Sequence, residues 1–225
     1  MHGRSRQHAL TTMAATAQSL RRLFAGAGGA FDATTVSAQG YRLALPSPSG
    51  PITIAAFGDR AIAIAAEHAD RMVLDIVTPQ QARNFRGKLD AAARRAGRPA
   101  PRLAAWLPAA VDPRPETYAQ ATHSLVGYLE VAGYAEMFAA AGLGRAVELA
   151  RSGSASRDQL EAALPPDAAS RAGLVGDAGT VRQRLADYAA GGLDEIVVVP
   201  ATAGDPRRRA HADGVGARGA AGRLR

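Results

Sequence analysis

The sequence predicts a parallel α/β fold that amounts to half of an eight-stranded barrel. Four short segments are almost wholly apolar, which is typical of parallel strands covered on both faces. Amphipathic helical segments separate them, and this alternation indicates strand–helix units. Because crossovers are right-handed, strands laid down in sequence order place their helices on one side, as a barrel does. A closed barrel needs about eight strands and ~250 residues, and these 225 residues contain four such strands.

The first half of the chain holds two strand–helix units behind a leading helix. Apolar residues recur at helical spacing in the leading segment, which ends in the glycine cluster 26–29. Thr78-Pro79-Gln80-Gln81 has the residues of a capping box with proline at the first helical position. The expected elements are a helix at 8–24, an irregular segment at 30–50, a strand at 52–57, a helix at 62–69, a strand at 72–77 and a helix at 80–96.

The second half continues the alternation but interrupts it with helical material. The third strand is longer than the others and contains Pro108, and the last one reads Leu193 to Pro200, the clearest strand of the chain. The expected elements are a strand at 103–111, a helix from Asp112 to Leu129, a helical insertion at 133–172 with helices at 134–141, 146–150 and 157–164, a helix after Asp177, and a strand at 194–200.

Composition excludes several classes of protein. There is no cysteine, so disulfides, thiolate zinc sites and cysteine nucleophiles are excluded, and a reducing cytoplasm is the expected location. No apolar run reaches the ~20 residues that cross a bilayer. Of the net charge of +7, residues 1–22 and 204–225 carry +4 each, which leaves −1 on the rest. A nucleic-acid interface needs a basic face on the folded body, so we expect no nucleic-acid partner.

Three segments, in order, resemble the luciferase-like monooxygenase family, in particular its branch that uses coenzyme F420. They are "ITIAAFGDRAIAIAAEHADRMVLDIVTP", "RLAAWLPAAVDPRPETYAQA" and "LVGDAGTVRQRLADYAAGGLDEIVVVP". The resemblance covers residues 8–203 and implies a partial (β/α)8 TIM barrel with strands five to eight. The insertion 133–172 precedes the last helix and strand, and the first four strands are absent. Residues 1–203 would then be the C-terminal half of the barrel, and residues 204–225 a basic, disordered tail.

The resemblance also implies where the phosphate end of a coenzyme binds. In relatives, main-chain groups after strand five and residues that end strand six hold it, and small residues there let the backbone approach a ligand. Two positions depart from the family pattern: Phe57 replaces a glycine, and the carboxylate of Asp75 would repel a phosphate. Arg71 is a further departure, expected at a surface turn. The matching positions are Ala55, Ala56, Phe57, Gly58, Asp75, Ile76 and Val77.

Other conspicuous residues are given structural roles. Residues 214–219 match G-x-G-x-x-G but neither follow a strand nor open a helix, so a disordered tail is favoured. No metal site is expected, because His68 and His123 have no ligands at metal spacing nearby. Asp70 is expected to cap a helix end or turn, and Trp106 to pack in a core. Asp194 and Glu195 precede a strand, at the edge where stability is the usual role.

The resemblance implies an oxidoreductase that passes a hydride between F420, or alternatively FMN, and a small organic substrate. Its catalytic residues stay unassigned, because the family's first four strands hold much of that site. Two alternatives remain open. The chain is either a non-catalytic remnant without coenzyme, or a half-barrel that forms a homodimer because its outer strands and inner face are otherwise open to water.

Overall fold

The computed structural model describes residues 8–26, 29–33, 36–41, 43–44 and 50–204. The expected basic tail and its G-x-G-x-x-G segment therefore lie outside the described residues. The chain divides into two compact units, each of which is described by itself. The first unit is Met1–Asp75, Pro79–Trp106 and Tyr188–Val197, and the second is Ile76–Thr78, Leu107–Asp187 and Val198–Arg225.

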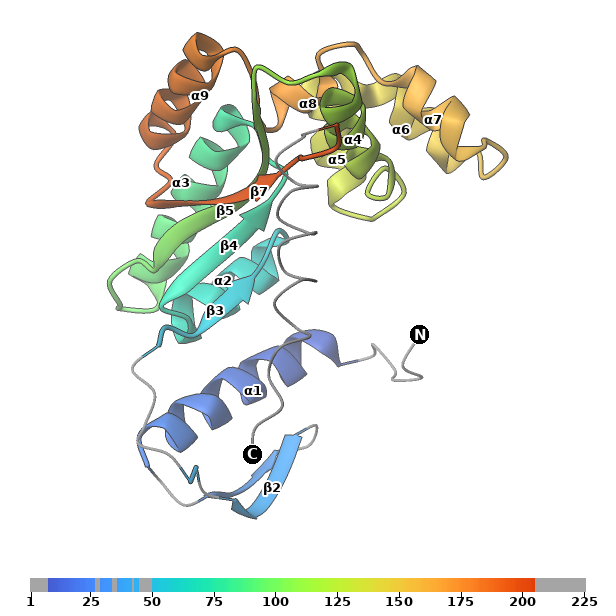
Figure 1. Ribbon diagram of the computed structural model, residues 1–225. Helices are drawn as coiled ribbons and strands as arrows, with labels where there is room; N and C mark the ends of the chain where they lie inside the picture. The colour runs from blue at the N-terminus through green and yellow to red at the C-terminus, as the bar shows by residue number, and fades with distance from the viewer. Residues whose placement is uncertain (1–7, 27–28, 34–35, 42, 45–49, 205–225) are drawn as a thin grey trace, which may run out of the picture. The chain divides into compact units, whose positions relative to one another are not determined.

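The first unit contains parallel strands in the expected places (Figure 1). β3 pairs with β4 through Ile54 opposite Met72, and β4 pairs with β5 through Met72 opposite Leu103, both in parallel. Its elements are α1 (Ala9–Phe24), β1 (Gly29–Ala33), β2 (Val36–Tyr41), β3 (Thr53–Ala55), α2 (Asp59–His68), β4 (Arg71–Asp75), α3 (Pro79–Arg95), and the first parts of β5 (Arg102–Val111) and β7 (Glu195–Pro200).

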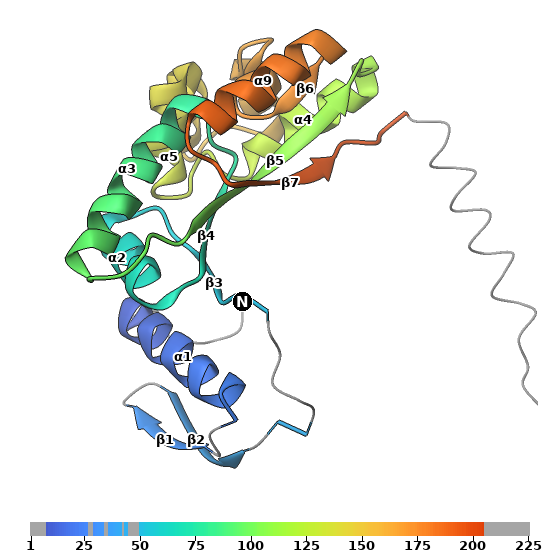
Figure 2. The ribbon, with the colours of Figure 1, turned by 90° about the vertical axis from the view of Figure 1, so that its left-hand side faces the viewer.

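Helices α2 and α3 cover one face of β3 and β4 (Figure 2). Successive strand residues point to opposite faces, and accordingly Met72 and Leu74 are fully buried whereas Val73 and Asp75 are half-exposed. The helices meet this face with the apolar stripes that the sequence predicts. Burying one such leucine contributes about 1.5–3 kcal/mol. The buried helical residues include Ile62, Ala65, Ala66, Ala82, Phe85 and Leu89.

An antiparallel hairpin occupies part of the segment that we expected to be irregular. β1 pairs with β2, with Phe31 opposite Ala38 and a shift in register after Gly29. The expectation for 30–50 is therefore wrong at 30–33 and 36–41. The two strands are rich in glycine, alanine and polar residues, so they lack the apolar alternation that announces a strand.

The second unit is built around helices, as the insertion predicted. Ser156 caps α7 by accepting a hydrogen bond from the amide of Gln159, and the Gln159 side chain bonds back to the amide of Ser156. Its elements are the rest of β5 and β7, α4 (Pro115–Val126), α5 (Tyr134–Phe138), the π-helical turn η1 (Ala139–Leu143), α6 (Gly144–Arg151), α7 (Arg157–Ala163), α8 (Ala168–Arg171), β6 (Leu174–Gly176) and most of α9 (Ala178–Ala190).

One apolar cluster forms the core of the helical part of this unit. Leu125 and Leu129 pack there with Phe138, all three fully buried. The remaining buried members are Ile76, Val126, Ala135, Leu143, Ala146, Val147, Ala150, Leu160, Leu164, Ala168 and Ala172.

The strands β3, β4, β5 and β6 pair in that order, and β7 also pairs with β5. All four expected strands are present, and the three pairings of known register among β3 to β6 are parallel. The sequence missed β6, whose three residues are too few to show a pattern. Their pairing with Ala109 to Val111 of β5 is what makes them a strand. The fold is thus mixed α/β with a parallel sheet, as in a TIM-barrel-like protein.

Candidate functional site: the ends of the parallel strands

The loop after β3 presents small residues at the carboxyl end of a strand. Ala55 is exposed, whereas Ala56 is buried and its amide donates to the carbonyl of Val73 at 3.4 Å. Gly58 is the N-cap of α2 with extended backbone, and a methyl group built on it would meet no atom within 4 Å. The main chain at Ala55 and Gly58 is therefore open to a ligand.

Phe57 does not fill this strand end. Its ring packs against Phe85 of α3, with centroids 5.7 Å apart in an edge-to-face arrangement. The side chain is half-buried. Phe57 stands where relatives have glycine, and its larger side chain thus points toward α3.

Asp75 and Trp106 end the first unit's portion of β4 and β5 side by side, as a register pair. The carboxylate of Asp75 disfavours an anion at this strand end. Trp106 is 52% exposed, so the expectation that it packs in a core is wrong. Its alternation with buried Ala105 and Leu107 places it on the face of the sheet opposite α2 and α3.

Ile76 and Val77 belong to the second unit, where their side chains are buried. Ile76 is 4% exposed and Val77 0% exposed, main chain included, so neither residue presents appreciable surface to a ligand. Ile76 has a φ of 51°, which is an outlier for a β-branched residue and costs about 1–3 kcal/mol. Their role in binding coenzyme stays a prediction from the family resemblance.

A hollow of about 520 Å³ in the second unit was not predicted from the sequence. Asp112 follows β5 directly with a φ of 47° and donates its amide to Gly176. Arg114 and Thr117 donate to the carbonyls of Gly204 and Ala203, at 3.1 and 2.6 Å. These polar groups therefore anchor residues 203–204 to α4. The full lining is Ala109, Ala110, Val111, Asp112, Pro113, Arg114, Thr117, Val198, Pro200, Ala201 and Thr202.

At the opposite, amino-terminal ends of the strands, charged residues pair with one another. Glu195 binds Arg71 at 2.8 Å and Arg102 at 2.9 Å. The Asp194 carboxylate accepts from the amide of Leu103 at 2.7 Å. These contacts give Asp194 and Glu195 the structural role that we expected. Arg71 is the first residue of β4, not part of a surface turn as expected, because it pairs with Thr53 of β3 and Arg102 of β5.

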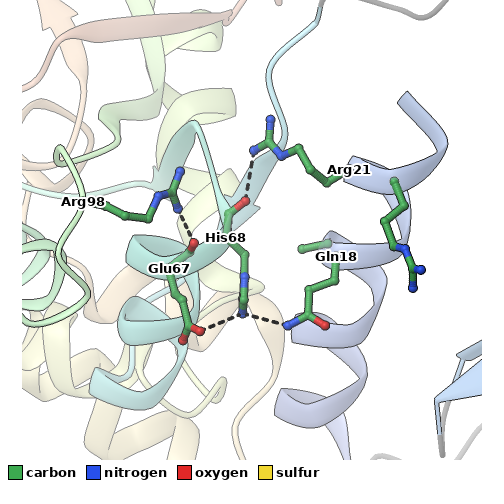
Figure 3. Close-up of a pocket in the computed structure, with 7 residues that line it drawn as sticks. Gln18, Arg21, Glu67, His68 and Arg98 are labelled. Atoms are coloured by element: carbon green, nitrogen blue, oxygen red, sulfur yellow. Dashed lines mark hydrogen bonds and ion pairs between the residues drawn. The ribbon is translucent and has the colours of Figure 1, made fainter. Parts of the chain in front are cut away.

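A second hollow, of about 400 Å³, lies between α1 and α2 in the first unit (Figure 3). Arg98 donates to the carbonyls of Ala66 and Glu67, and Arg21 donates to that of His68 at 3.2 Å. Both arginines thus satisfy carbonyls at the C-terminal end of α2, where cations are favourable. The basic character of this hollow has a structural explanation.

His68 and Asp70 also make contacts between α1 and the C-terminal end of α2. The Nε2 atom of His68 lies 3.4 Å from the amide nitrogen of Gln18 and 3.6 Å from a carboxylate oxygen of Glu67 (Figure 3). Asp70 accepts from Arg21 at 3.0 Å and from the Ile52 amide at 2.9 Å. Burial raises the pKa of Asp70, but these hydrogen bonds and the Arg21 charge outweigh it and hold the pKa below its usual value.

The remaining histidine that we singled out, His123, pairs with Glu161 at 2.8 Å. Within the described part of the chain, no three His, Asp or Glu side chains are grouped so that they could hold a metal ion. None of the helices that the structure describes is both long and apolar enough to span a membrane.

Two solved structures of similar fold are enzymes described as F420-dependent. F420-dependent tetrahydromethanopterin reductase from Methanopyrus kandleri matches 89% of this chain with a TM-score of 0.68 and 15% identity. An F420-dependent secondary alcohol dehydrogenase, in complex with an F420-acetone adduct, matches 84% with a TM-score of 0.61 and 14% identity. The chain covers 60% and 55% of the lengths of these two proteins. At such identities the likeness concerns the fold alone.

No curated protein matches the sequence significantly. The profile of one family, described as luciferase-like monooxygenase, matches residues 1–195. This match spans most of the chain and includes the first two of the three segments that carry the resemblance, together with most of the third. The chain belongs to the luciferase-like monooxygenase family.

Proposed function

We propose that this chain carries the coenzyme-binding strand ends of an oxidoreductase of the luciferase-like type, with F420 as the coenzyme and FMN as the alternative. Family membership supports this reading, as do the solved structures whose names include F420. In this proposal β3, β4, β5 and β7 are strands five to eight of a barrel, residues 1–203 are its C-terminal half, and residues 204–225 are a separate tail.

The loop after β3 is the observation that carries the proposal. Ala55 and Gly58 leave the main chain open, while Phe57 is held against α3. The loop leads into the N-terminus of the ten-residue helix α2, where an anion is favoured. These groups suit the phosphate end of a coenzyme and would orient it at this strand end.

Acidic side chains near this loop act against an anion, and one of them is neutralised. Asp59, in the first turn of α2, pairs with Lys88 at 2.7 Å. The hydrogen bond and positive charge of Lys88 lower the pKa of Asp59. A carboxylate side chain, Asp75, also ends β4, so we place the phosphate at Ala55–Gly58 and not beside Asp75.

The ring of the bound coenzyme would supply the hydride chemistry, and this chain would supply its anchor. Because the chain spans no more than about 60% of the two F420 enzymes compared, its substrate and catalytic residues stay unassigned. A chain without activity remains the alternative.

Titration of the purified chain with F420 and, separately, with FMN tests the proposal. We expect a saturable change in coenzyme fluorescence with one of the two. Riboflavin, which lacks the phosphate, should bind at least tenfold more weakly than FMN if the phosphate is the anchored group. The absence of any change with either coenzyme would overturn the proposal and favour the non-catalytic alternative.

A further inference from the structure

The hollow between α1 and α2 gathers positive charge from three segments of the first unit (Figure 3). We call it the basic hollow. Arg21 and Arg22 lie in the last turn of α1, and Arg98 lies just after α3. Among the described residues that line the hollow, Glu67 is the only one with a carboxylate. Three guanidinium groups against one carboxylate leave a charge of +2 around about 400 Å³.

Within the described residues, these arginines are only partly neutralised. Arg21 pairs with Asp70 at 3.0 Å, and the two side chains remain 48% and 36% exposed. The carboxylate of Glu67 lies 3.6 Å from the Nε2 atom of His68 (Figure 3). The other two arginines that line the hollow form no ion pair with a described side chain. Even when Asp70 is counted, the surroundings of the hollow therefore carry one excess positive charge.

Two of these arginines are anchored by the main chain and keep unused donors. Arg98 donates through Nη1 to carbonyls at the C-terminal end of α2, and Arg21 donates there through Nη2. These contacts offset the partial negative charge of the helix end. A guanidinium has five N–H donors in a planar fork, so the Nη2 group of Arg98 and the Nη1 group of Arg21 are left for a ligand. Because both side chains are already ordered, a ligand that binds them loses little affinity to their ordering.

We propose that the basic hollow binds the phosphate group of a small soluble molecule. A guanidinium pairs with phosphate or carboxylate through two parallel hydrogen bonds. A phosphate monoester carries about 1.5–2 negative charges at pH 7 and three acceptor oxygens, so it matches both the charge of the hollow and its separate donors. A carboxylate has one charge and two oxygens. The volume of about 400 Å³ lies in the range of small-molecule sites, about 300–1,000 Å³.

The basic hollow is distinct from the loop where we place the phosphate of the coenzyme. Helix α2 runs from Asp59 to His68, and ten residues of helix span about 15 Å. The loop precedes the N-terminal end of α2, whereas the hollow lies at its C-terminal end. The inference therefore does not rest on the proposed function.

Calorimetric titration with inorganic phosphate and with pyrophosphate tests the proposal. Sodium chloride holds the ionic strength constant, and the melting temperature is followed in parallel because a bound ligand stabilises the folded chain. We expect saturable binding with a dissociation constant below about 1 mM for at least one of the two probes. Citrate, a polycarboxylate, should bind at least about tenfold more weakly. The absence of binding by both phosphate probes would overturn the proposal, as would tighter binding of citrate.

Vesicles of phosphatidylcholine with phosphatidic acid distinguish a lipid source of the phosphate from a soluble one. A soluble ligand predicts that the chain stays in the supernatant when such vesicles are sedimented. Cosedimentation that phosphate and pyrophosphate fail to prevent would assign the hollow to a lipid surface and refute the soluble ligand.

Arg98→Lys keeps a positive charge and a donor but loses the planar fork, so it should weaken phosphate binding about tenfold. The matched control is Arg145→Lys, the same change at an exposed residue of α6 in the second unit, which should have no effect. Far-UV circular dichroism checks that both variants fold. Should Arg98→Lys not fold, Arg22→Gln removes a charge that has no hydrogen bond or ion pair with a described residue, and it should weaken binding about threefold. Unchanged binding by the folded variant would contradict the proposal.

Glu67→Gln tests the sign of the charge in the hollow. Removal of the one carboxylate among the described lining residues should tighten phosphate binding about threefold. Glu130→Gln removes the same charge at an exposed position of the second unit and should leave the affinity unchanged. Weaker or unchanged binding by Glu67→Gln would exclude an anion from this hollow.

One cross-comparison separates this site from the coenzyme loop. Gly58→Asp adds a negative charge to that loop, so it should leave phosphate binding in the hollow unchanged, and Arg98→Lys should leave coenzyme binding unchanged. A phosphate affinity that falls in Gly58→Asp and not in Arg98→Lys would place the anion at the loop. That result would refute the basic hollow as a phosphate site while supporting the proposed function.

Discussion

Replacing Gly58 by aspartate should weaken coenzyme binding and leave the stability of the fold nearly unchanged. Gly58 is the N-cap of α2 with φ −77° and ψ 148°, a conformation that aspartate adopts readily, and its Cβ would meet open space. Aspartate and asparagine are both better N-caps than glycine. The free energy of unfolding of each variant should therefore equal that of the unmodified chain to within about 0.5 kcal/mol, or exceed it slightly. The two differ by one charge at the position where we place the phosphate.

The size of the effect follows from Coulomb's law. A carboxylate about 6 Å from one phosphate charge, at an effective dielectric constant of about 20–40, costs about 1.4–2.8 kcal/mol. Gly58→Asp should therefore weaken coenzyme binding by about 10- to 100-fold. Gly58→Asn adds similar bulk without charge, so any excess loss in the aspartate variant is electrostatic. That excess should shrink at about 1 M salt, where screening acts over about 3 Å.

The assay is fluorescence titration of both variants and the unmodified chain with the coenzyme that binds. Urea unfolding of the three proteins confirms that they are equally stable. If folded Gly58→Asp binds the coenzyme as tightly as Gly58→Asn does, the phosphate does not lie at this loop. The same result would leave family membership untouched.

Three further predictions concern stability. Glu195→Gln leaves Arg71 and Arg102 without their shared counter-charge and should lower the free energy of unfolding by urea by about 1–3 kcal/mol. Lys88→Gln, at an exposed ion pair, should change it by less than about 0.5 kcal/mol. Equal effects of the two substitutions would contradict a stabilising role for the Arg71–Glu195–Arg102 cluster. Gly192→Ala should cost about 1–3 kcal/mol, because φ is 86° and the new Cβ would lie 2.7 Å from the Cγ atom of Arg86. Gly87→Ala, in open space within α3, should stabilise by about 0.5–1 kcal/mol, and a neutral Gly192→Ala would refute the reasoning. Asp177 accepts from the Thr180 amide at 2.6 Å, and this hydrogen bond lowers its pKa. The stabilisation by the Asp177 carboxylate should be present above the unfolded pKa of about 3.9 and disappear as the pH falls through the folded pKa. The melting temperatures of Asp177→Ala and the unmodified chain should therefore differ at pH 7 and converge near pH 2–3. A difference that stays constant with pH would show that the ionisation of Asp177 does not contribute to stability.

The local sequence pattern was sufficient to predict a helix or strand wherever that element was long or strongly apolar. The stripes that begin at Ile62 and Ala82 became α2 and α3, and the runs at 72–77 and 103–111 became parallel strands. The hairpin of β1 and β2 and the three residues of β6 escaped notice because their strand character comes from pairing with a distant segment. Arg71 was misplaced for the same reason, since its strand partners Thr53 and Arg102 lie far from it along the chain.

Part of the candidate site could likewise be predicted from the sequence, and part of it required the structure. The resemblance pointed to Ala55 and Gly58, and small residues at a strand end are visible in sequence. That Phe57 turns to Phe85, that Ile76 and Val77 bury their side chains, and that Asp112 borders a hollow required three-dimensional packing.

The sequence by itself determined the order of the long helices and of the four apolar strands, because periodicity and turn residues act within a few positions along the chain. It also determined the family, through motifs that match in order. Only the tertiary structure decided which side chains face solvent. Trp106 and Val197 are apolar residues of the kind that usually form a core, yet both are exposed. Burial depends on what packs across from a residue and not on its own chemistry.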